Sequence, residues 1–304
     1  MEKMKFEEFT NEVVEKIKEW LPDNYCDAEI HVKSIKKNND LTLTGLTIMC
    51  RECNVAPTIY LEQFYDSYQD GMDMPAILRR IAELRVENNV TENFDTNEIT
   101  DLEKCRDKIL PRLIGAKRNE NMLEELPHVM LEDLAVIFCI NLDNSENTEA
   151  TIKVTNALRV LWKLSTEELY DIAIKNLTEW HNGKLTSLAE VIYNMAKEND
   201  IYEEECMLSK DDMFYVLSNN YNVNGAAEIL DDEIMKQATE ILGEEFYVLP
   251  SSIHELLLVP MTDKIEPSFL RAMVCQVNES TVQPEEQLSD NVYIYSVEKG
   301  LKLA

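Results

Sequence analysis

The spacing of hydrophobic residues changes from a helical to a strand period within the first sixty residues. Apolar side chains recur at three- and four-residue steps from Phe6 to Leu21, which predicts an amphipathic helix ended by Pro22. A strand pattern, in which apolar side chains alternate with polar ones or form short runs, occurs instead at residues 28–33, 41–48 and 56–61. We therefore expect a helix followed by a three-stranded antiparallel meander.

The next segment contains the predicted domain boundary. Helical spacing returns over residues 62–68 and 75–86, with Gly71 and Pro75 between the two pieces. Residues 88–100 are poor in apolar side chains and rich in Asn, Thr, Asp and Glu, a composition typical of linkers. The sequence thus predicts an N-terminal domain over residues 1–95 and a C-terminal domain over residues 101–304.

The C-terminal part mixes strand and helix patterns without regular alternation. Strands are predicted at residues 108–116, 129–131, 134–142, 150–154, 213–218, 246–249 and 292–296, and helices at residues 156–164, 165–180, 187–197, 231–242 and 267–277. Residues 143–149 are expected to form a turn, and the apolar run 256–259 fits either element. A doubly wound parallel sheet requires repeated βαβ units, so we predict an α+β fold with a larger mixed C-terminal domain.

Charge limits the classes of partner. The 304 residues contain 58 Asp and Glu against 29 Lys and Arg, a formal charge of −29, and every third of the chain is acidic. Binding to phosphate backbones or anionic lipid depends on Lys and Arg, so we expect neither generic nucleic-acid binding nor membrane binding. Acidic residues also stand at positions 2, 7 and 8, where a signal peptide needs apolar ones, which favours a cytoplasmic location.

Few chemical motifs are present. Only seven glycines occur, and neither GxxxxGK[ST] nor GxGxxG is found, so the familiar nucleotide-binding signatures are absent and we expect no cofactor. Cys50 and Cys53 form a single CxxC, a weak candidate for metal binding or redox chemistry because no second ligand pair accompanies it. Seven cysteines cannot all pair within one chain, and reduced thiols fit best.

One run resembles a hydrolytic constellation. Ser251, Ser252, His254 and Glu255 follow Pro250 and provide a hydroxyl, an imidazole and a carboxylate. A triad is defined by geometry, and no GxSxG elbow accompanies this run. The alternative interpretation is structural: Pro250 ends a strand, Ser251 or Ser252 caps the start of the next element, and that element begins at His254.

Two stretches carry a family resemblance. Residues 54–62 (NVAPTIYLE) and 246–255 (FYVLPSSIHE) resemble a bacterial family described only as a domain of unknown function, over nearly the whole chain. Residues from about 105 to 260 are also similar, more faintly, to a second uncharacterised bacterial family. Neither resemblance implies catalytic residues, a cofactor or a substrate.

Three hypotheses about function follow from the sequence. The first is a cytoplasmic acidic interaction module that contacts a basic partner protein, because an acidic surface accelerates and orients such an encounter. The second is an enzyme of unrecognised type with a site where the domains meet, to which the Ser251–Glu255 run contributes. The third is a small-molecule sensor. The sequence does not determine the oligomeric state.

Overall fold

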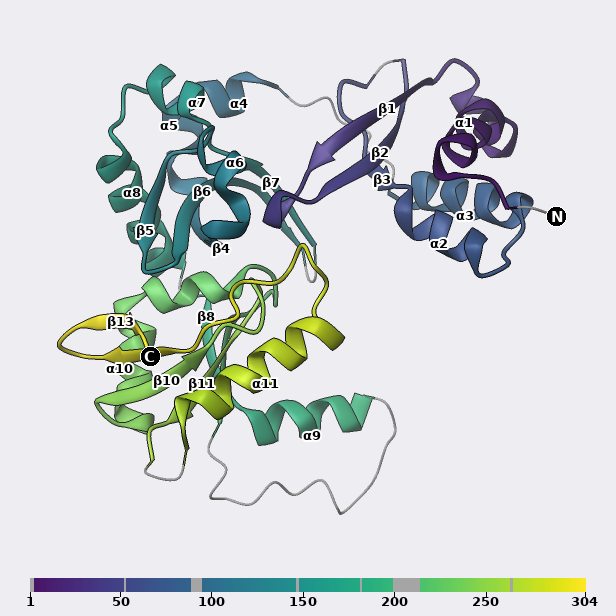
Figure 1. Cartoon of the computed structure of the whole chain (residues 1–304). Helices are drawn as coiled ribbons and strands as arrows, with labels where there is room; N and C mark the ends of the chain where they lie inside the picture. The colour runs from purple at the N-terminus through teal and green to yellow at the C-terminus, as the bar shows by residue number, and fades with distance from the viewer. Residues whose placement is uncertain are drawn as a thin grey trace. The chain divides into compact units, whose positions relative to one another are not determined.

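The protein is described by a computed structural model that covers residues 3–51, 53–88, 95–145, 148–180, 182–198, 214–262 and 265–304 (Figure 1). The chain divides into two compact units. Unit 1 comprises Met1–Lys37 and Leu41–Glu98, and unit 2 comprises Asn38–Asp40 and Ile99–Ala304. Each unit has antiparallel sheets and helices, which confirms the α+β prediction.

Unit 1 is a three-stranded sheet with helices on one face. Its elements are α1 (Phe6–Lys16), a 3₁₀ turn (Ile17–Trp20), η2 (Asp23–Tyr25), β1 (Glu29–Lys36), β2 (Thr42–Met49), β3 (Thr58–Tyr60), α2 (Glu62–Gln69) and α3 (Met74–Glu87). The sheet order is β1-β2-β3, with both pairs antiparallel, so the predicted meander is confirmed. Apolar side chains that alternate along β2, such as Leu46 and Ile48, pack on Phe9 and Val13 of α1 and on Ile77 of α3.

A fully buried arginine joins the sheet and helices of unit 1. The guanidinium of Arg85 on α3 donates from Nε to the Ile48 carbonyl at 2.9 Å and from Nη1 to the Tyr25 hydroxyl at 3.2 Å. It also lies over the Tyr25 ring, 5.0 Å from the ring centroid. These contacts give the buried charge the polar partners that it needs.

The first half of unit 2 is a four-stranded sheet. The strands are β4 (Ile109–Gly115), β5 (His128–Leu131), β6 (Leu134–Ser145) and β7 (Thr148–Lys153), and β6 pairs with the other three. The helices are α4 (Asn97–Thr100), α5 (Leu102–Cys105), η4 (Arg106–Lys108), η5 (Lys117–Asn119), α6 (Glu120–Leu123), α7 (Asn156–Leu161) and α8 (Thr166–Trp180). At the start of α8, where the sequence predicts a helix over residues 165–180, Ser165 Oγ accepts from the Glu168 amide at 3.1 Å and caps the helix.

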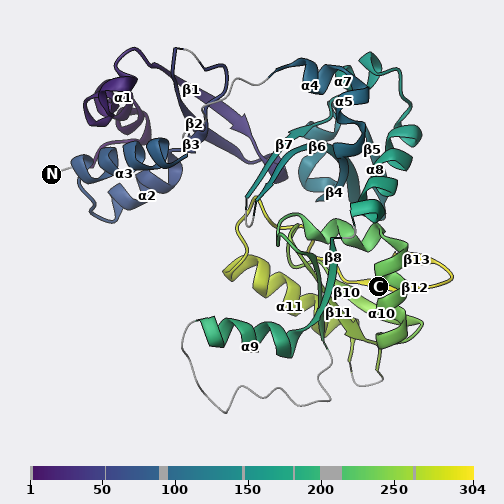
Figure 2. The same ribbon diagram turned by 180° about the vertical axis from the view of Figure 1, so that it is seen from behind.

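The second half of unit 2 is a six-stranded sheet in the order β13-β12-β10-β11-β9-β8. Its elements are β8 (Gly183–Ser187), α9 (Leu188–Glu198), β9 (Tyr215–Asn219), η6 (Gly225–Leu230), α10 (Asp232–Leu242), β10 (Glu245–Leu249), β11 (Leu256–Pro260), α11 (Pro267–Ser280), β12 (Tyr293–Ser296) and β13 (Gly300–Leu303). Side chains alternate along β10, so Phe246 and Val248 face α10 while Tyr247 and Leu249 face α11. The two helices thus cover opposite faces of this sheet (Figures 1 and 2).

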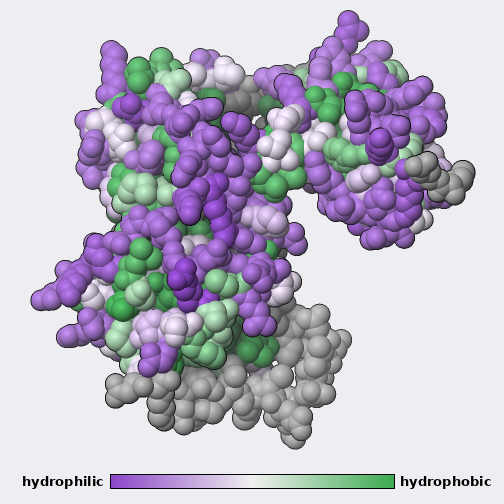
Figure 3. Space-filling model, in the orientation of Figure 1, coloured by the Kyte–Doolittle hydropathy of each residue, from purple (hydrophilic) through white to green (hydrophobic). Residues whose placement is uncertain are grey.

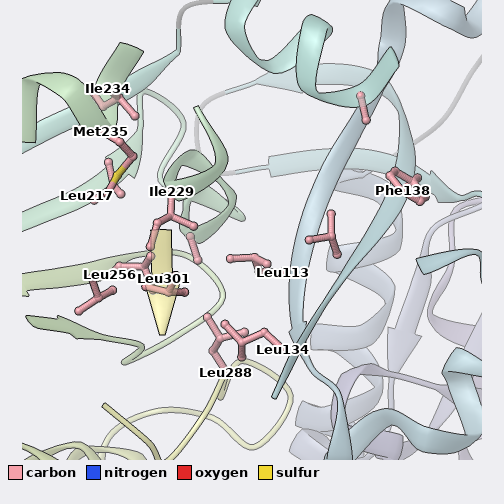
Figure 4. Packing of buried hydrophobic residues seen from close by; sticks show 14 of the residues in the cluster. Leu113, Leu134, Phe138, Leu217, Ile229, Ile234, Met235, Leu256, Leu288 and Leu301 are labelled. Carbon is pink, nitrogen blue, oxygen red and sulfur yellow. The ribbon is translucent and has the colours of Figure 1, made fainter. Parts of the chain in front are cut away.

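One hydrophobic core runs through both sheets of unit 2. Leu113, Leu134 and Phe138 of the four-stranded sheet belong to the same buried cluster as Leu217 of β9 and Met235 of α10 (Figure 4). Burial of this shared apolar surface is the main reason why the two sheets form one unit.

A partly buried hydrogen-bond cluster adds to this packing. Asp133, in the turn between β5 and β6, accepts from the Tyr293 hydroxyl of β12, from Ser289 Oγ at 3.2 Å and from Asn291 Nδ2 at 2.8 Å. Burial, and to a lesser degree this carboxylate, raises the pKa of the Tyr293 hydroxyl. The cluster joins the β5–β6 turn of the four-stranded sheet to β12 of the six-stranded sheet and to the residues just before β12.

The sequence-based elements differ from the structure at several points. β8 and β13 were not predicted, and the ambiguous run at 256–259 is a strand. The predicted turn over residues 143–149 is wrong in extent, because β6 continues to Ser145 and β7 begins at Thr148. Pairing with a neighbouring strand supplies hydrogen bonds that extend both strands beyond their apolar core. Part of the predicted linker, residues 89–94, lies outside the described residues.

Candidate functional site

The Ser251–Glu255 run forms the connection between β10 and β11. Ser252 Oγ accepts from the backbone amide of His254 at 3.0 Å, and Ser251 Oγ is 3.5 Å from the Glu255 carbonyl oxygen. The hydroxyls therefore bond to backbone groups of their own turn, as the structural interpretation expects.

The imidazole of His254 holds a neighbouring loop. Its Nδ1 accepts from the backbone amide of Asn224 at 3.1 Å, and its Nε2 lies 3.6 Å from Glu286 Oε1. The carbonyl of His254 also accepts from Ser218 Oγ at 2.8 Å. These bonds position the segment from β9 to η6, and the catalytic interpretation of the run stays a prediction.

Gly225 permits the close approach in this region. A Cβ at position 225 would touch Ser218 Oγ and would lie 2.7 Å from both the Asn219 amide nitrogen and the His254 carbonyl oxygen. No side chain fits there, so the loop, β9 and the β10–β11 connection can meet only with glycine at this position.

Cys50 and Cys53 lie in a turn of unit 1. The backbone amide of Cys53 donates to the Cys50 carbonyl at 3.1 Å, and Cys50 Sγ lies 3.7 Å from Nη2 of the buried Arg85. Among the described residues, no group of three His, Cys, Asp or Glu side chains could hold a metal ion. The described helices include none that is long and apolar enough to cross a membrane.

A polar cavity lies along the free edge of β4. β4 is an edge strand, and η6 packs beside it. The cavity is lined by residues of β4, β6, α8 and the β9–η6 segment, and its polar and aromatic members are Arg112, Asn141, Trp180, Asn182, Asn219, Tyr221, Asn224 and Glu228. Its volume is about 40 Å³, which holds about three or four water-sized groups at roughly 10–15 Å³ each.

Glu228 is the most unusual residue of this cavity. It is 2% exposed, and its Oε2 has no hydrogen-bond partner in the described part of the chain. Oε2 lies against Gly183 of β8, where an added Cβ would come within 2.9 Å of it. Burial, together with the nearby Asp231 carboxylate, raises the pKa of Glu228 to about 8. The carboxyl group is therefore predominantly protonated and neutral at pH 7.

The segment between β9 and η6, which lines part of the cavity, is held by hydrogen bonds between an asparagine side chain and the backbone of the same segment. Asn219 Oδ1 accepts from the backbone amides of Tyr221 and Val223, and its Nδ2 donates to the Val223 carbonyl at 2.8 Å. Asn222 and Asn224 both have positive φ, 54° and 55°, a conformation that asparagine tolerates. The cavity wall is thus built by local hydrogen bonds before any ligand is present.

Neither Glu228 nor Arg112 is predicted as a site residue by a motif in the sequence. The available signal was the composition of residues 225–230, GAAEIL, in which one carboxylate stands among small and apolar residues. Such a run predicts close packing, and a carboxylate within it is a candidate for burial. Arg112 alternates with apolar residues on β4 and looks like an ordinary edge-strand charge.

Comparison with known proteins gives a family. The profile of a family described as "Family of unknown function (DUF5688)" matches residues 6–297. The chain belongs to this family. The DUF5688 match spans nearly the full length, which confirms the first resemblance, whereas the fainter resemblance of residues 105–260 to a second family stays a prediction. No curated protein and no solved structure matches the chain.

Proposed function

We propose that unit 2 binds a small polar molecule in the cavity beside Glu228. The observation that carries this proposal is a carboxyl group that is 2% exposed and lacks a partner for Oε2 among the described residues, in a cavity whose lining also includes four asparagines. An unsatisfied buried polar atom costs about 1–3 kcal/mol, and native proteins contain few of them. A ligand that satisfies the carboxyl group recovers this cost on binding.

The dimensions of the cavity limit the ligand. A volume of about 40 Å³ accommodates an ion or a small polar group but no nucleotide or sugar ring within the enclosed part. Asparagine side chains line the wall, and an amide side chain can both donate and accept hydrogen bonds. This proposal develops the sensor hypothesis that follows from the sequence.

A thermal-shift screen tests the proposal. A library of small polar metabolites is tested against the wild-type protein, the Glu228→Gln variant and the matched control Glu240→Gln, which changes an exposed glutamate of α10 in the same unit. We expect at least one compound to raise the Tm of the wild type and of the control but not that of Glu228→Gln, because a ligand that binds only the folded state stabilises it. If every stabilising compound acts equally on all three proteins, the cavity is not the binding site.

We propose, as a second function, contact with a basic partner protein. The charge of −29 favours it, and Figure 3 shows hydrophilic side chains over most of the visible face. Electrostatic steering of this kind weakens as salt rises. Affinity capture from lysate at low and high salt tests it: we expect a basic protein whose capture decreases with salt, and capture of salt-insensitive proteins alone counts against it.

If the captured partner binds DNA, a specific form of this function applies. The acidic surface then acts as a mimic of nucleic acid, and the protein should compete with a DNA duplex for the partner. Simultaneous binding of DNA and protein to the partner would exclude the mimic.

A further inference from the structure

Asparagine is followed by glycine at two places in the chain, Asn182-Gly183 and Asn224-Gly225. In such a pair the glycine nitrogen can attack the side-chain carbonyl carbon of the asparagine, because the glycine has no Cβ that shields its nitrogen. This reaction is one reason why asparagine limits the chemical lifetime of proteins. The folded backbone decides whether the two atoms can meet, and the two pairs lie in different surroundings.

The first pair lies at the start of β8, which is an edge strand. The backbone amide of Asn220 donates to the Asn182 carbonyl at 3.0 Å, and Gly183 stands opposite Asn219 in the strand register. Bonded and non-bonded pairs alternate along antiparallel strands, so the Gly183 amide points away from β9. On that side β8 has no neighbouring strand among the described residues. The attacking nitrogen is therefore not held by the β8–β9 pairing.

The side chain of Asn182 has room to turn towards this nitrogen. It is partly exposed, it lines the cavity beside Glu228, and no hydrogen bond holds it within the described part of the chain. The cavity has space for water-sized groups, and water is the second reactant. Rotation of the peptide between Asn182 and Gly183 breaks the hydrogen bond from Asn220, at the edge of the sheet where few other contacts oppose it.

The second pair is held on both sides. The Asn224 amide donates to His254 Nδ1 at 3.1 Å, and the Asn224 carbonyl accepts from the Ala227 amide at 3.4 Å. Gly225 is buried, and a Cβ at this position would lie only 2.7 Å from the His254 carbonyl oxygen. The peptide between Asn224 and Gly225 can rotate only if these close neighbours move.

We propose that Asn182 is a site of spontaneous covalent modification in the folded protein, and that the fold protects Asn224. The Gly183 nitrogen bonds to Cγ of Asn182, the bond from Cγ to Nδ2 breaks, and the nitrogen's proton leaves with the departing ammonia. Water then opens the cyclic imide at either carbonyl carbon and yields aspartate or isoaspartate. The sum of both steps consumes water, releases ammonia and involves no oxidant or reductant.

The modification changes the cavity and the start of β8. Either product carries a negative charge at neutral pH where Asn182 had a neutral amide, on a wall that also includes Glu228. Isoaspartate in addition routes the main chain through the side-chain methylene group, which lengthens the backbone directly before Gly183. Glu228 Oε2 lies against Gly183, so this lengthening disturbs a buried contact. The reaction requires only water, so the inference is independent of the proposed ligand.

Peptide mapping of the folded full-length protein tests the proposal. The protein is kept at physiological temperature in mildly alkaline buffer, and samples are digested with trypsin over several weeks. Cleavage after Lys175 and Lys184 places Asn182 in the 176–184 peptide, where fragmentation distinguishes it from Asn176. Conversion adds about 1 Da to the peptide. We expect Asn182 to convert at least about tenfold faster than Asn224, and the Tm of the converted protein to be lower than that of fresh protein.

Two controls separate the effect of the fold from that of the local sequence. In concentrated urea both pairs should convert at similar rates, because the neighbours that distinguish them are no longer in place. The Asn182→Gln variant keeps the amide but would have to close a larger ring. Its 176–184 peptide should gain no mass during incubation of the folded protein, and its Tm should stay at the starting value.

Three results would overturn the proposal. The first is conversion of Asn182 in the folded protein no faster than that of Asn224. The second is an unchanged Asn182 after the interval in which the urea sample has converted. The third is a mass gain in the 176–184 peptide that fragmentation assigns to Asn176. The metabolite screen decides the proposed function separately from all three.

Discussion

The neutral carboxyl group of Glu228 makes the stability of unit 2 depend on pH in an unusual direction. In the unfolded chain this carboxyl ionises with a pKa near 4.5, and in the folded protein the pKa is about 8. Between these two values the folded state holds a proton that the unfolded state has lost. The contribution of this group to the free energy of unfolding is therefore greatest below pH 4.5, and it decreases as the pH rises towards 8.

The magnitude follows from the shift of the pKa. The difference, 8 − 4.5 = 3.5 units, sets an upper limit of about 5 kcal/mol on the total effect at roughly 1.4 kcal/mol per unit. The Glu228→Gln variant keeps the shape of the side chain and removes the carboxyl group that titrates. Relative to the wild type, its free energy of unfolding should rise by about 3 kcal/mol between pH 5.5 and pH 8.5.

Urea unfolding of unit 2 measures this difference. The chain has three tryptophans, Trp20 in unit 1 and Trp162 and Trp180 in unit 2, so a Trp20→Phe background makes the fluorescence specific for unit 2. Unfolding curves at four pH values between 5.5 and 8.5 are compared for the background protein, Glu228→Gln and the control Glu240→Gln. If the difference between Glu228→Gln and the background varies by less than about 0.5 kcal/mol over this range, the burial argument for Glu228 is refuted.

Three other substitutions test the packing that supports the site and the two units. Gly225→Ala should destabilise unit 2 by about 2–3 kcal/mol, because the added methyl group overlaps the Ser218 hydroxyl and the backbone of β9; an unchanged urea midpoint would contradict the close approach. Tyr293→Phe removes the hydroxyl that donates to Asp133 and should cost about 1–3 kcal/mol in the same assay. Arg85→Lys loses the planar donor fork in unit 1 and should lower its stability by about 2–3 kcal/mol, measured by Trp20 fluorescence; a cost within 0.5 kcal/mol would show that the guanidinium bonds contribute little.

The sequence by itself determined most of the elements and the fold class. Periodicity identified α1, the meander of unit 1 and β10, because a helix or strand that buries one face repeats its apolar residues at 3.6 or 2 positions. The predicted helices over residues 165–180 and 231–242 likewise match α8 and α10, which begin after the capping residue Ser165 and end before Gly243. These signals depend on residues close in the chain, so they can be recognised in the sequence.

Strand pairing and the cavity depended on the tertiary structure. β8 and β13 are edge strands, and edge strands are held by hydrogen bonds to a distant partner more than by an apolar pattern of their own. Glu228 and Arg112 are 116 positions apart, and only the packing of η6 against β4 brings them to one cavity. The pKa of Glu228 is raised because neighbouring elements exclude water from it. No local sequence pattern indicates that water is excluded from Glu228. The sequence therefore supplied the carboxyl group, and the tertiary fold determined its pKa.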